Sequence, residues 1–454
     1  MNTFVPWIVL ASILILSGCV SDNEAGSESS SMTAGGAGGL GGDSTGAGGS
    51  VTSDTDGGLG GEGGQGAASD QGGLGGSGGE AGAGGVGGEG GMVPEPMPRP
   101  PAPAHFGGDR PAEYFLPRGH DASAPMALVL SLHGYSGNAQ GQNAYFGLSE
   151  HLRDRGALLI TPNGRVNRSG LRFWHATDFC CDFEGAGDID VEYLRGLIEE
   201  AMEYFPIDPE RISVIGHSNG GFMAYRLACD ASDLVTNIVS LAGTSWADAG
   251  RCGETEPVSV LQIHGTWDTT IRYAGRERTV GDPDAPFDVF ACRARECADS
   301  GTTCQSDEDC PTIWACMNQC GWGQGTDDCR QICYLQGDIE GRVYWMDDFV
   351  CMINEGCADN PAEPFYGYAS AEEVVTRWRV RNECDEEAED SQALDLVRAL
   401  PGVDTTATRW PNGRRGTEAN LWRINRGSHG PGFRSLYGAL VVEWMMSTPR
   451  SDGD

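Results

Sequence analysis

The stretch at residues 211–227, RISVIGHSNGGFMAYRL, restricts the possible fold more than any other part of the chain. An isoleucine- and valine-rich run leads into GHSNG (residues 216–220), and the apolar residues beyond it recur at helical spacing. A strand, a tight turn and a helix in immediate succession are the context of a nucleophile elbow, where glycines let the neighbouring chain pass close by. The pattern alone is weak, because residues 75–79 also read G-x-S-x-G within a glycine-rich tract. The prediction therefore rests on the context.

Ser218, at the centre of this turn, is the predicted nucleophile. Its hydroxyl would point to solvent at the positive end of the following helix, where the backbone N–H of Asn219 can donate to a developing oxyanion. A structural serine in a glycine turn is the alternative. The strand and the helix on either side favour the catalytic interpretation.

The remaining globular sequence alternates between strand and helix patterns. Short apolar runs that suit buried strands lie at residues 127–132, 157–161, 211–216, 237–241, 258–263 and 421–425. Apolar residues at helical spacing lie at residues 188–205, 371–380 and 436–446. Strands that alternate with helices predict an α/β fold, with a mostly parallel sheet covered on both faces, in a catalytic domain over residues 105–454.

The N-terminus predicts export. Residues 4–16 form an apolar run that is short for a membrane span, and it ends in Leu16-Ser17-Gly18-Cys19. This box resembles a bacterial lipoprotein signal (residues 1–19), which implies lipidation of Cys19 and a membrane anchor. No Lys or Arg precedes the run, and ordinary secretion with cleavage elsewhere is the alternative. Residues 20–104 are rich in Gly, Ala and Ser and close with prolines, so we predict a disordered tether.

The cysteines also point to an oxidising compartment, since sixteen would be unusual in a reducing one. Ten of them fall in residues 291–357, where the strand–helix alternation stops, and we predict a small disulfide-held insertion. Two C-x-x-x-C pairs there would each lie on one helix face, and two such helices would be joined most simply by bridges Cys316–Cys333 and Cys320–Cys329. A zinc site is the alternative, which the absence of histidines disfavours.

A formal net charge of −35 excludes nucleic acid as a partner, because phosphate binding requires clustered basic side chains. All thirty basic residues are arginines.

A serine hydroxyl needs a base within hydrogen-bond reach and an acid that orients the base. Two histidines, His264 and His429, follow Ser218 in the sequence. His429 lies in a loop of small residues after the last predicted strand, and we predict that it is the base. Asp268 follows a strand end and is the predicted acid, whereas His264 is the predicted structural residue of that turn. A surface histidine and a turn-capping aspartate are the alternatives for His429 and Asp268. The order Ser, Asp, His is that of α/β-hydrolases.

Several segments together resemble the extracellular polyhydroxybutyrate depolymerase and feruloyl or acetylxylan esterase family of α/β-hydrolases. They are HGYSG, FWHATDFCC, GDIDVEYL, FPIDPERISVIGHSNGGFMAYRLAC, IHGTWDTTIRYAG and GSHGPGF, within about residues 105–290 and 365–446. The resemblance implies hydrolysis of esters in polyesters or plant polysaccharides, with nucleophile Ser218, acid Asp268 and base His429. Two departures are the missing tryptophan after the histidine and the cysteine-rich insertion between acid and base.

Further residues complete the predicted site. The second oxyanion donor is expected from the loop after residues 127–132, where the backbone N–H of Tyr135 is the candidate. Trp174, Trp246 and Trp267 are candidates for the wall of a substrate pocket, with core packing as the alternative. Two bridges are expected to brace the region before and after the elbow, in a pairing left open, among Cys180, Cys181, Cys229 and Cys252.

The sequence therefore predicts a secreted, surface-tethered serine esterase that needs no metal or organic cofactor. An inactive hydrolase scaffold that serves as a surface binding protein, and a serine peptidase, are the alternatives. Because the base must be neutral, activity is expected to rise through the usual histidine range, near about pH 6 to 7.

Overall fold

The computed structural model describes residues 99–182, 185–278, 289–320, 333, 336, 338–357, 359 and 366–451. The predicted signal with Cys19, and the predicted tether before residue 99, lie outside these described residues.

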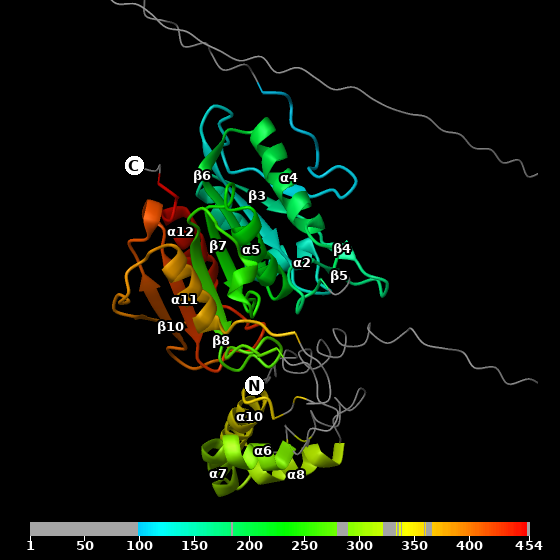
Figure 1. The fold of residues 1–454 in the computed structure, drawn as a ribbon, viewed down its shortest axis with the longest axis vertical. Coiled ribbons are helices and arrows are strands. Elements are labelled where there is room, and N and C mark those ends of the chain that lie inside the picture. Colours follow the sequence, from blue (N-terminus) through cyan, green and yellow to red (C-terminus); the bar gives the residue numbers. More distant parts are fainter. Residues whose placement is uncertain are drawn as a thin grey trace, which may run out of the picture. The chain divides into compact units, whose positions relative to one another are not determined.

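A nine-stranded sheet forms the centre of the predicted catalytic domain (Figure 1). Its strand order is β1-β3-β2-β6-β7-β8-β11-β10-β9. The inner strands from β3 to β11 run parallel to their neighbours, while β1, β10 and β9 pair antiparallel at the two edges. The bounds are β1 Glu113–Phe115, β2 Met126–Leu132, β3 Ala157–Thr161, β6 Ile207–His217, β7 Asn237–Leu241, β8 Ser259–Gly265, β9 Gln392–Leu394, β10 Thr405–Trp410 and β11 Ala419–Ile424. A small hairpin pairs β4 (Arg165–Val166) with β5 (Arg172–Phe173).

Helices cover both faces of the sheet, as the alternating pattern predicted. Successive residues of β2 point to opposite faces, so that Leu128 and Leu130 join one buried cluster and Val129 joins the other. The first cluster receives apolar side chains from α4 (Ile189–Tyr204), α5 (Asn219–Asp230) and α11 (Ala371–Arg381). The second receives them from α2 (Ala139–Phe146), α3 (Ser149–Asp154) and α12 (Ser435–Ser447). The parallel strands are therefore buried on both sides.

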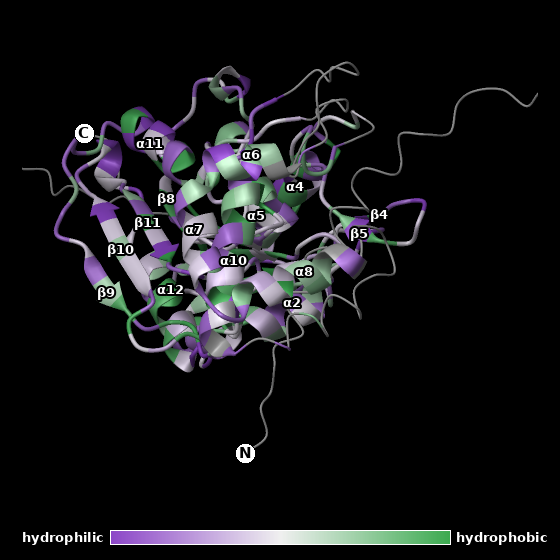
Figure 2. Cartoon of the chain, turned by 90° about the horizontal axis from the view of Figure 1, so that it is seen from below, coloured by the Kyte–Doolittle hydropathy of each residue, from purple (hydrophilic) through white to green (hydrophobic). Residues whose placement is uncertain are grey.

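The predicted strands and helices are all present, with ends that differ by a few residues at most. The edge strands were not predicted. Strand β10 reads TTATRW and is only partly buried, and its hydrophilic residues are visible in Figure 2. Strands β1 and β9 have three residues each, which is too short to show an alternating pattern.

The cysteine-rich insertion is helical and contains four helices among its described residues: α6 (Val289–Glu296), α7 (Ala298–Ser306), α8 (Cys310–Cys320) and α10 (Ile339–Asn354). The predicted bridge Cys316–Cys333 is present. Three further bridges are Cys292–Cys357, Cys297–Cys351 and Cys304–Cys310. The second predicted bridge involves Cys329, which lies outside the described residues.

In the part of the chain that the structure describes, no helix combines the length and apolar character required to cross a bilayer.

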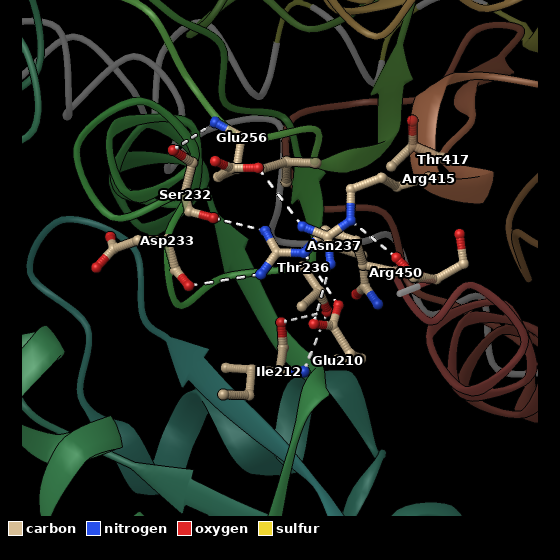
Figure 3. Close-up of polar contacts among 12 residues, drawn as sticks. Glu210, Ile212, Ser232, Asp233, Thr236, Asn237, Glu256, Arg415, Thr417 and Arg450 are labelled. Atoms are coloured by element: carbon tan, nitrogen blue, oxygen red, sulfur yellow. Dashed lines mark hydrogen bonds and ion pairs between the residues drawn. The ribbon is translucent and has the colours of Figure 1, made fainter. Parts of the chain in front are cut away.

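A polar cluster around Arg450 fixes the C-terminal segment near the start of β6 and β7 (Figure 3). Arg450 has a side chain that is only 5% exposed, and its Nε pairs with Glu210 Oε2 at 3.1 Å. Its Nη1 donates to the carbonyl oxygen of Ser232 at 2.6 Å, and Glu210 also pairs with Arg415 at 3.1 Å. One buried guanidinium thus joins the residues after α12 to β6 and to the α5–β7 loop.

We expect Arg450→Met to lower the free energy of unfolding by about 2 to 4 kcal/mol, because it leaves buried acceptors without donors. Urea denaturation would measure the change. The control is Arg118→Met, which removes ion pairs with Glu150 and Asp154 among side chains that are all more than half exposed, and it should cost less than about 1 kcal/mol. Equal losses in the two variants would contradict the prediction.

Candidate active site

Ser218 lies at the sharp turn between β6 and α5, in a backbone conformation that is uncommon for serine, with φ 56° and ψ −121°. The turn is possible only because its flanking residues are glycines. A Cβ on Gly216 would lie 2.0 Å from the carbonyl oxygen of Gly220, and a Cβ on Gly220 would lie 2.4 Å from that of Leu132. This is the close passage of chain that an elbow requires.

The structure brings together the three residues that the sequence predicted as nucleophile, base and acid. Asp268 follows the carboxyl end of β8, and His429 lies in the loop between β11 and α12. The Nε2 atom of His429 is 2.9 Å from Ser218 Oγ, and its Nδ1 atom is 2.8 Å from Asp268 Oδ2. All three residues are buried, with exposures of 6% for Ser218, 0% for Asp268 and 6% for His429.

The surroundings of Asp268 keep it ionised. Burial alone would raise the pKa of this carboxyl, but the nearby His429 and the hydrogen bonds of His264 and His429 outweigh that effect and hold the pKa well below its ordinary value. Asp268 Oδ1 also accepts the backbone N–H groups of Thr270 and Ile271, each at 2.9 Å.

The hydrogen-bond partners determine the tautomer of His429. An ionised carboxylate only accepts, so Nδ1 of His429 carries the proton that faces Asp268. The Nε2 atom is then left as an acceptor opposite the hydroxyl of Ser218. His264, the predicted structural residue, has its Nε2 atom 2.8 Å from the carbonyl oxygen of Ile271 and 3.3 Å from Asp268 Oδ2. His264 and His429 therefore both contact the same carboxylate oxygen of Asp268.

The predicted oxyanion donors lie on the two chain segments next to Ser218. Asn219 is the first residue of α5, and the first N–H groups of a helix have no intrahelical acceptor. Tyr135 lies in the loop after β2, and a Cβ on the preceding Gly134 would be 3.3 Å from Ser218 Cβ. The Asn219 side chain is used elsewhere, because its Oδ1 accepts from Trp174 N at 2.7 Å and its Nδ2 donates to Trp174 O at 2.9 Å.

Two residues near the site were missed by the sequence analysis. His217 is in contact with the His429 loop, with its Nε2 atom 2.9 Å from the carbonyl oxygen of His429 and the two rings 5.0 Å apart. Tyr145 packs on His217 and donates from its hydroxyl to Pro431 O at 3.1 Å. The only signal in the sequence was the histidine inside the elbow motif itself.

Trp174 is a core residue, the alternative that the sequence left open. Its side chain is fully buried, and its Nε1 donates to His133 O at 2.9 Å, so the indole is bonded to the loop after β2, while the Trp174 backbone bonds to the Asn219 side chain of the elbow. Trp246 is likewise buried. Trp267 is half-buried and contacts the insertion through its Nε1, which donates to Asp347 Oδ1 at 2.9 Å.

The cysteines around the elbow are buried or bonded. Cys229 and Cys252 form a disulfide with each other. Cys180 and Cys181 lie buried in the loop before α4, where Cys180 O is 3.4 Å from Asn219 Nδ2. The zinc alternative is wrong for Cys316, because a cysteine bonded to Cys333 cannot be a thiolate ligand. Among the described residues, no group of three or more His, Cys, Asp or Glu side chains is arranged so that it could hold a metal ion.

Two buried histidines make the fold sensitive to acid. Burial lowers the pKa of His133 to about 4. Burial, and secondarily the neighbouring His429, lower the pKa of His217 to about 3. Because histidines in the unfolded chain titrate near about pH 6.5, the unfolded state binds protons below that pH that the native state does not. The stabilisation is therefore complete above about pH 6.5 and is lost as the pH falls toward the native values.

We expect the free energy of unfolding to be nearly constant above pH 7 and to fall below pH 6.5 by up to about 1.4 kcal/mol per pH unit for each of these histidines. Urea denaturation between pH 8 and pH 5 would measure the slope. In His217→Gln the slope should decrease by up to about 1.4 kcal/mol per pH unit, the contribution of one histidine. An unchanged slope would contradict the prediction that His217 contributes to the acid sensitivity.

The parallel sheet, the elbow after β6 and the positions of Asp268 and His429 after β8 and β11 define an α/β-hydrolase fold. Comparison with known proteins agrees with this class. Residues 104–325 match the family model described as putative esterase.

Individual relatives share one segment of their length with this chain. The putative esterase NocK of Nocardia uniformis subsp. tsuyamanensis is 30% identical over 170 residues, which are 37% of this chain and 46% of that protein. Feruloyl esterase B of Piromyces equi is 25% identical over 163 residues, which are 35% of this chain and 29% of that protein. The chain thus spans less than half the length of these two curated relatives. Among solved structures, the acetyl xylan esterase from Aspergillus awamori is matched over 74% of this chain and 93% of its own, at 12% identity and a TM-score of 0.39.

Proposed function

We propose that this protein is a serine ester hydrolase that works through an acyl-enzyme intermediate. The observation that carries the proposal is the pair of contacts made by one imidazole: 2.9 Å from His429 Nε2 to Ser218 Oγ and 2.8 Å from His429 Nδ1 to Asp268 Oδ2. Such an arrangement turns a poor nucleophile into a competent one, because the base lies within hydrogen-bond reach and a carboxylate holds its tautomer.

In the first half of the reaction, the oxygen of Ser218 attacks the ester carbonyl carbon while His429 Nε2 takes the hydroxyl proton. Asp268 stabilises the imidazolium that forms, and the backbone N–H groups of Asn219 and Tyr135 stabilise the oxyanion. The tetrahedral intermediate collapses when His429 returns the proton to the leaving alcohol. The acyl group is then bonded to Ser218.

In the second half, water takes the place of the alcohol. His429 removes a proton from the water, the resulting hydroxide attacks the acyl carbon, and a second tetrahedral intermediate forms in the same oxyanion site. Collapse of this intermediate releases the carboxylic acid and returns the proton to Ser218. The ester and one water molecule enter, the alcohol and the carboxylic acid leave, and Ser218 and His429 return to their starting protonation states.

The proposed substrates are carboxylic esters of a polymer, either a polyhydroxyalkanoate-type polyester or feruloyl and acetyl esters of plant polysaccharide. The similarity to feruloyl esterase B of Piromyces equi and the sequence resemblance support this substrate class. We also propose that the enzyme acts outside the cytoplasm, held to the cell envelope by lipid on Cys19. Five disulfides among the described residues support export, because such bonds persist in oxidising compartments.

Covalent labelling with a fluorophosphonate tests the chemistry. The expected result is one added phosphonyl group per chain, found by peptide mass analysis on Ser218, with loss of activity toward a short-chain nitrophenyl ester. Labelling of other residues, or activity that survives complete labelling, would contradict the proposal. Trials on polyhydroxybutyrate film, feruloylated xylan and acetylxylan, with an amide analogue beside each ester, would then separate the substrate classes and a peptidase from an esterase.

A further inference from the structure

One carboxylate of the insertion joins the loop that carries Asp268 to the loop that carries His429. Asp347 lies in the middle of α10, and its Oδ1 accepts the indole N–H of Trp267 at 2.9 Å. Its other oxygen, Oδ2, pairs with Arg426 Nη2 at 3.0 Å. Trp267 immediately precedes Asp268 in the sequence, and Arg426 lies three residues before His429.

The two loops are also joined to each other at this point. Trp267 N donates to Gly427 O at 2.9 Å, and Arg426 N donates to Thr266 Oγ1 at 2.8 Å. The guanidinium of Arg426 lies 5.4 Å from the centre of the Trp267 ring. Arg426 has a φ of 59°, which is uncommon for a residue with a side chain and persists only where surrounding contacts hold it.

Apolar packing and a disulfide hold the part of the insertion that makes this contact. Trp267 packs against the buried apolar cluster of the insertion, which includes Trp345 and Phe349. Helix α10 is itself fastened by the disulfide Cys297–Cys351. A second contact follows Asp268, where Arg272 pairs with Asp359 at 2.5 Å. Asp359 lies just beyond the insertion, so the segment that carries the acid is held by the insertion before Asp268 and by a residue that follows the insertion after it.

We propose that Asp347 is a positioning residue for the Ser218–His429–Asp268 site, through which the cysteine-rich insertion supports catalysis. The inference rests on the proposed function and extends it to a part of the chain outside the parallel sheet. Asp347 touches none of the three residues. It acts by holding Trp267 and Arg426, and hence the backbone that leads into Asp268 and His429.

The exposure of this contact indicates that it serves geometry more than stability. The side chains of Asp347 and Arg426 are 33% and 51% exposed, and ion pairs of this kind add little to folding stability. The reaction rate is far more sensitive to the positions of the reacting groups, since displacement of one of them by about 1 Å lowers the rate on the order of a hundredfold. Loss of Asp347 should therefore affect turnover while the fold persists.

The test compares Asp347→Asn, Asp347→Ala and Trp267→Phe in the full chain, with a short-chain nitrophenyl ester. We expect kcat to fall by about 5- to 50-fold in Asp347→Ala, with KM within about twofold of wild type and Tm nearly unchanged. Trp267→Phe retains an aromatic side chain but removes the indole N–H together with the five-membered ring, so it should lower kcat in the same direction. The double variant Asp347→Ala/Trp267→Phe should be no worse than Asp347→Ala, since the two residues share one contact. Glu340→Ala, on the same helix and exposed, is the matched control and should behave as wild type.

Hydrogen exchange gives a readout that does not depend on activity. In Asp347→Asn, which preserves the size of the side chain, peptides covering residues 265–272 and 425–430 should exchange faster than in wild type, whereas those from β6 and α5 should not. A kcat within twofold of wild type in Asp347→Ala, with unchanged exchange in both loops, would overturn the inference. If wild type and Ser218→Ala were equally inactive, the proposed function would fail instead, and the exchange data would still decide whether Asp347 holds the loops.

Discussion

Ser218→Ala is expected to lower the hydrolysis of a short-chain nitrophenyl ester by about 10⁴- to 10⁶-fold, as measured by kcat under saturating substrate. The physical reason is that the substitution removes the hydroxyl oxygen that lies 2.9 Å from His429 Nε2, so that no acyl-enzyme can form. The residual activity comes from the oxyanion donors and from substrate binding, which still favour direct attack by water, a poorer nucleophile than the activated serine. Burst kinetics should disappear together with turnover.

A serine on the same strand supplies the control for this substitution. The hydroxyl of Ser213, in β6, is buried and makes no hydrogen bond to any described residue. Ser213→Ala should therefore keep full activity and equal or exceed the stability of wild type, because it removes a buried polar group without a partner. If Ser218→Ala hydrolysed the ester as fast as a fully active Ser213→Ala, Ser218 would not be the nucleophile. If wild type and both variants all matched the uncatalysed rate, the chain would be an inactive hydrolase scaffold, and its recognition of a surface partner would be the function to pursue.

Asp268→Asn is expected to lower kcat by about 10⁴-fold with little change in KM. The amide oxygen must remain where Oδ1 lies, since that position accepts the N–H groups of Thr270 and Ile271. The amide NH₂ then faces Nδ1 of His429, which must become an acceptor. The proton of the neutral imidazole moves to Nε2, so that His429 can no longer accept the proton of Ser218.

The matched control for this substitution is Glu418→Gln. Glu418 is a buried carboxylate just before β11, at the end of the strand opposite the loop of His429, and it pairs with Arg409 and accepts from Trp444 Nε1, each at 2.6 Å. Its replacement should lower stability and leave kcat unchanged. A similar fall of kcat in both variants would mean that the effect of Asp268→Asn is a general loss of structure.

The residues of the candidate site could be predicted because short stretches of sequence identify the turn and the strand ends on which they lie. The glycines at 216 and 220, the buried strand before them and the helical spacing after them identify the turn, since no residue with a Cβ fits at either position. The order of Ser218, Asp268 and His429, each after a strand end, then followed from the tendency of parallel strands to end at one edge of the sheet. The interpretation of Trp174 and Trp246 as pocket residues had no such support, because the sequence carries no signal that distinguishes a tryptophan in the core from one in a pocket wall.

What the sequence determined by itself was the class of fold, the residue types of the elbow and the presence of a separate cysteine-rich segment. These depend on backbone geometry and on apolar spacing over a few residues. Only the tertiary structure decided that Cys229 pairs with Cys252, that His217 contacts the carbonyl of His429, and that Asp347 reaches Trp267 and Arg426 across eighty positions of sequence. Such contacts depend on how loops with little periodicity are placed in the tertiary structure, and no local sequence pattern predicts which distant residue a side chain contacts.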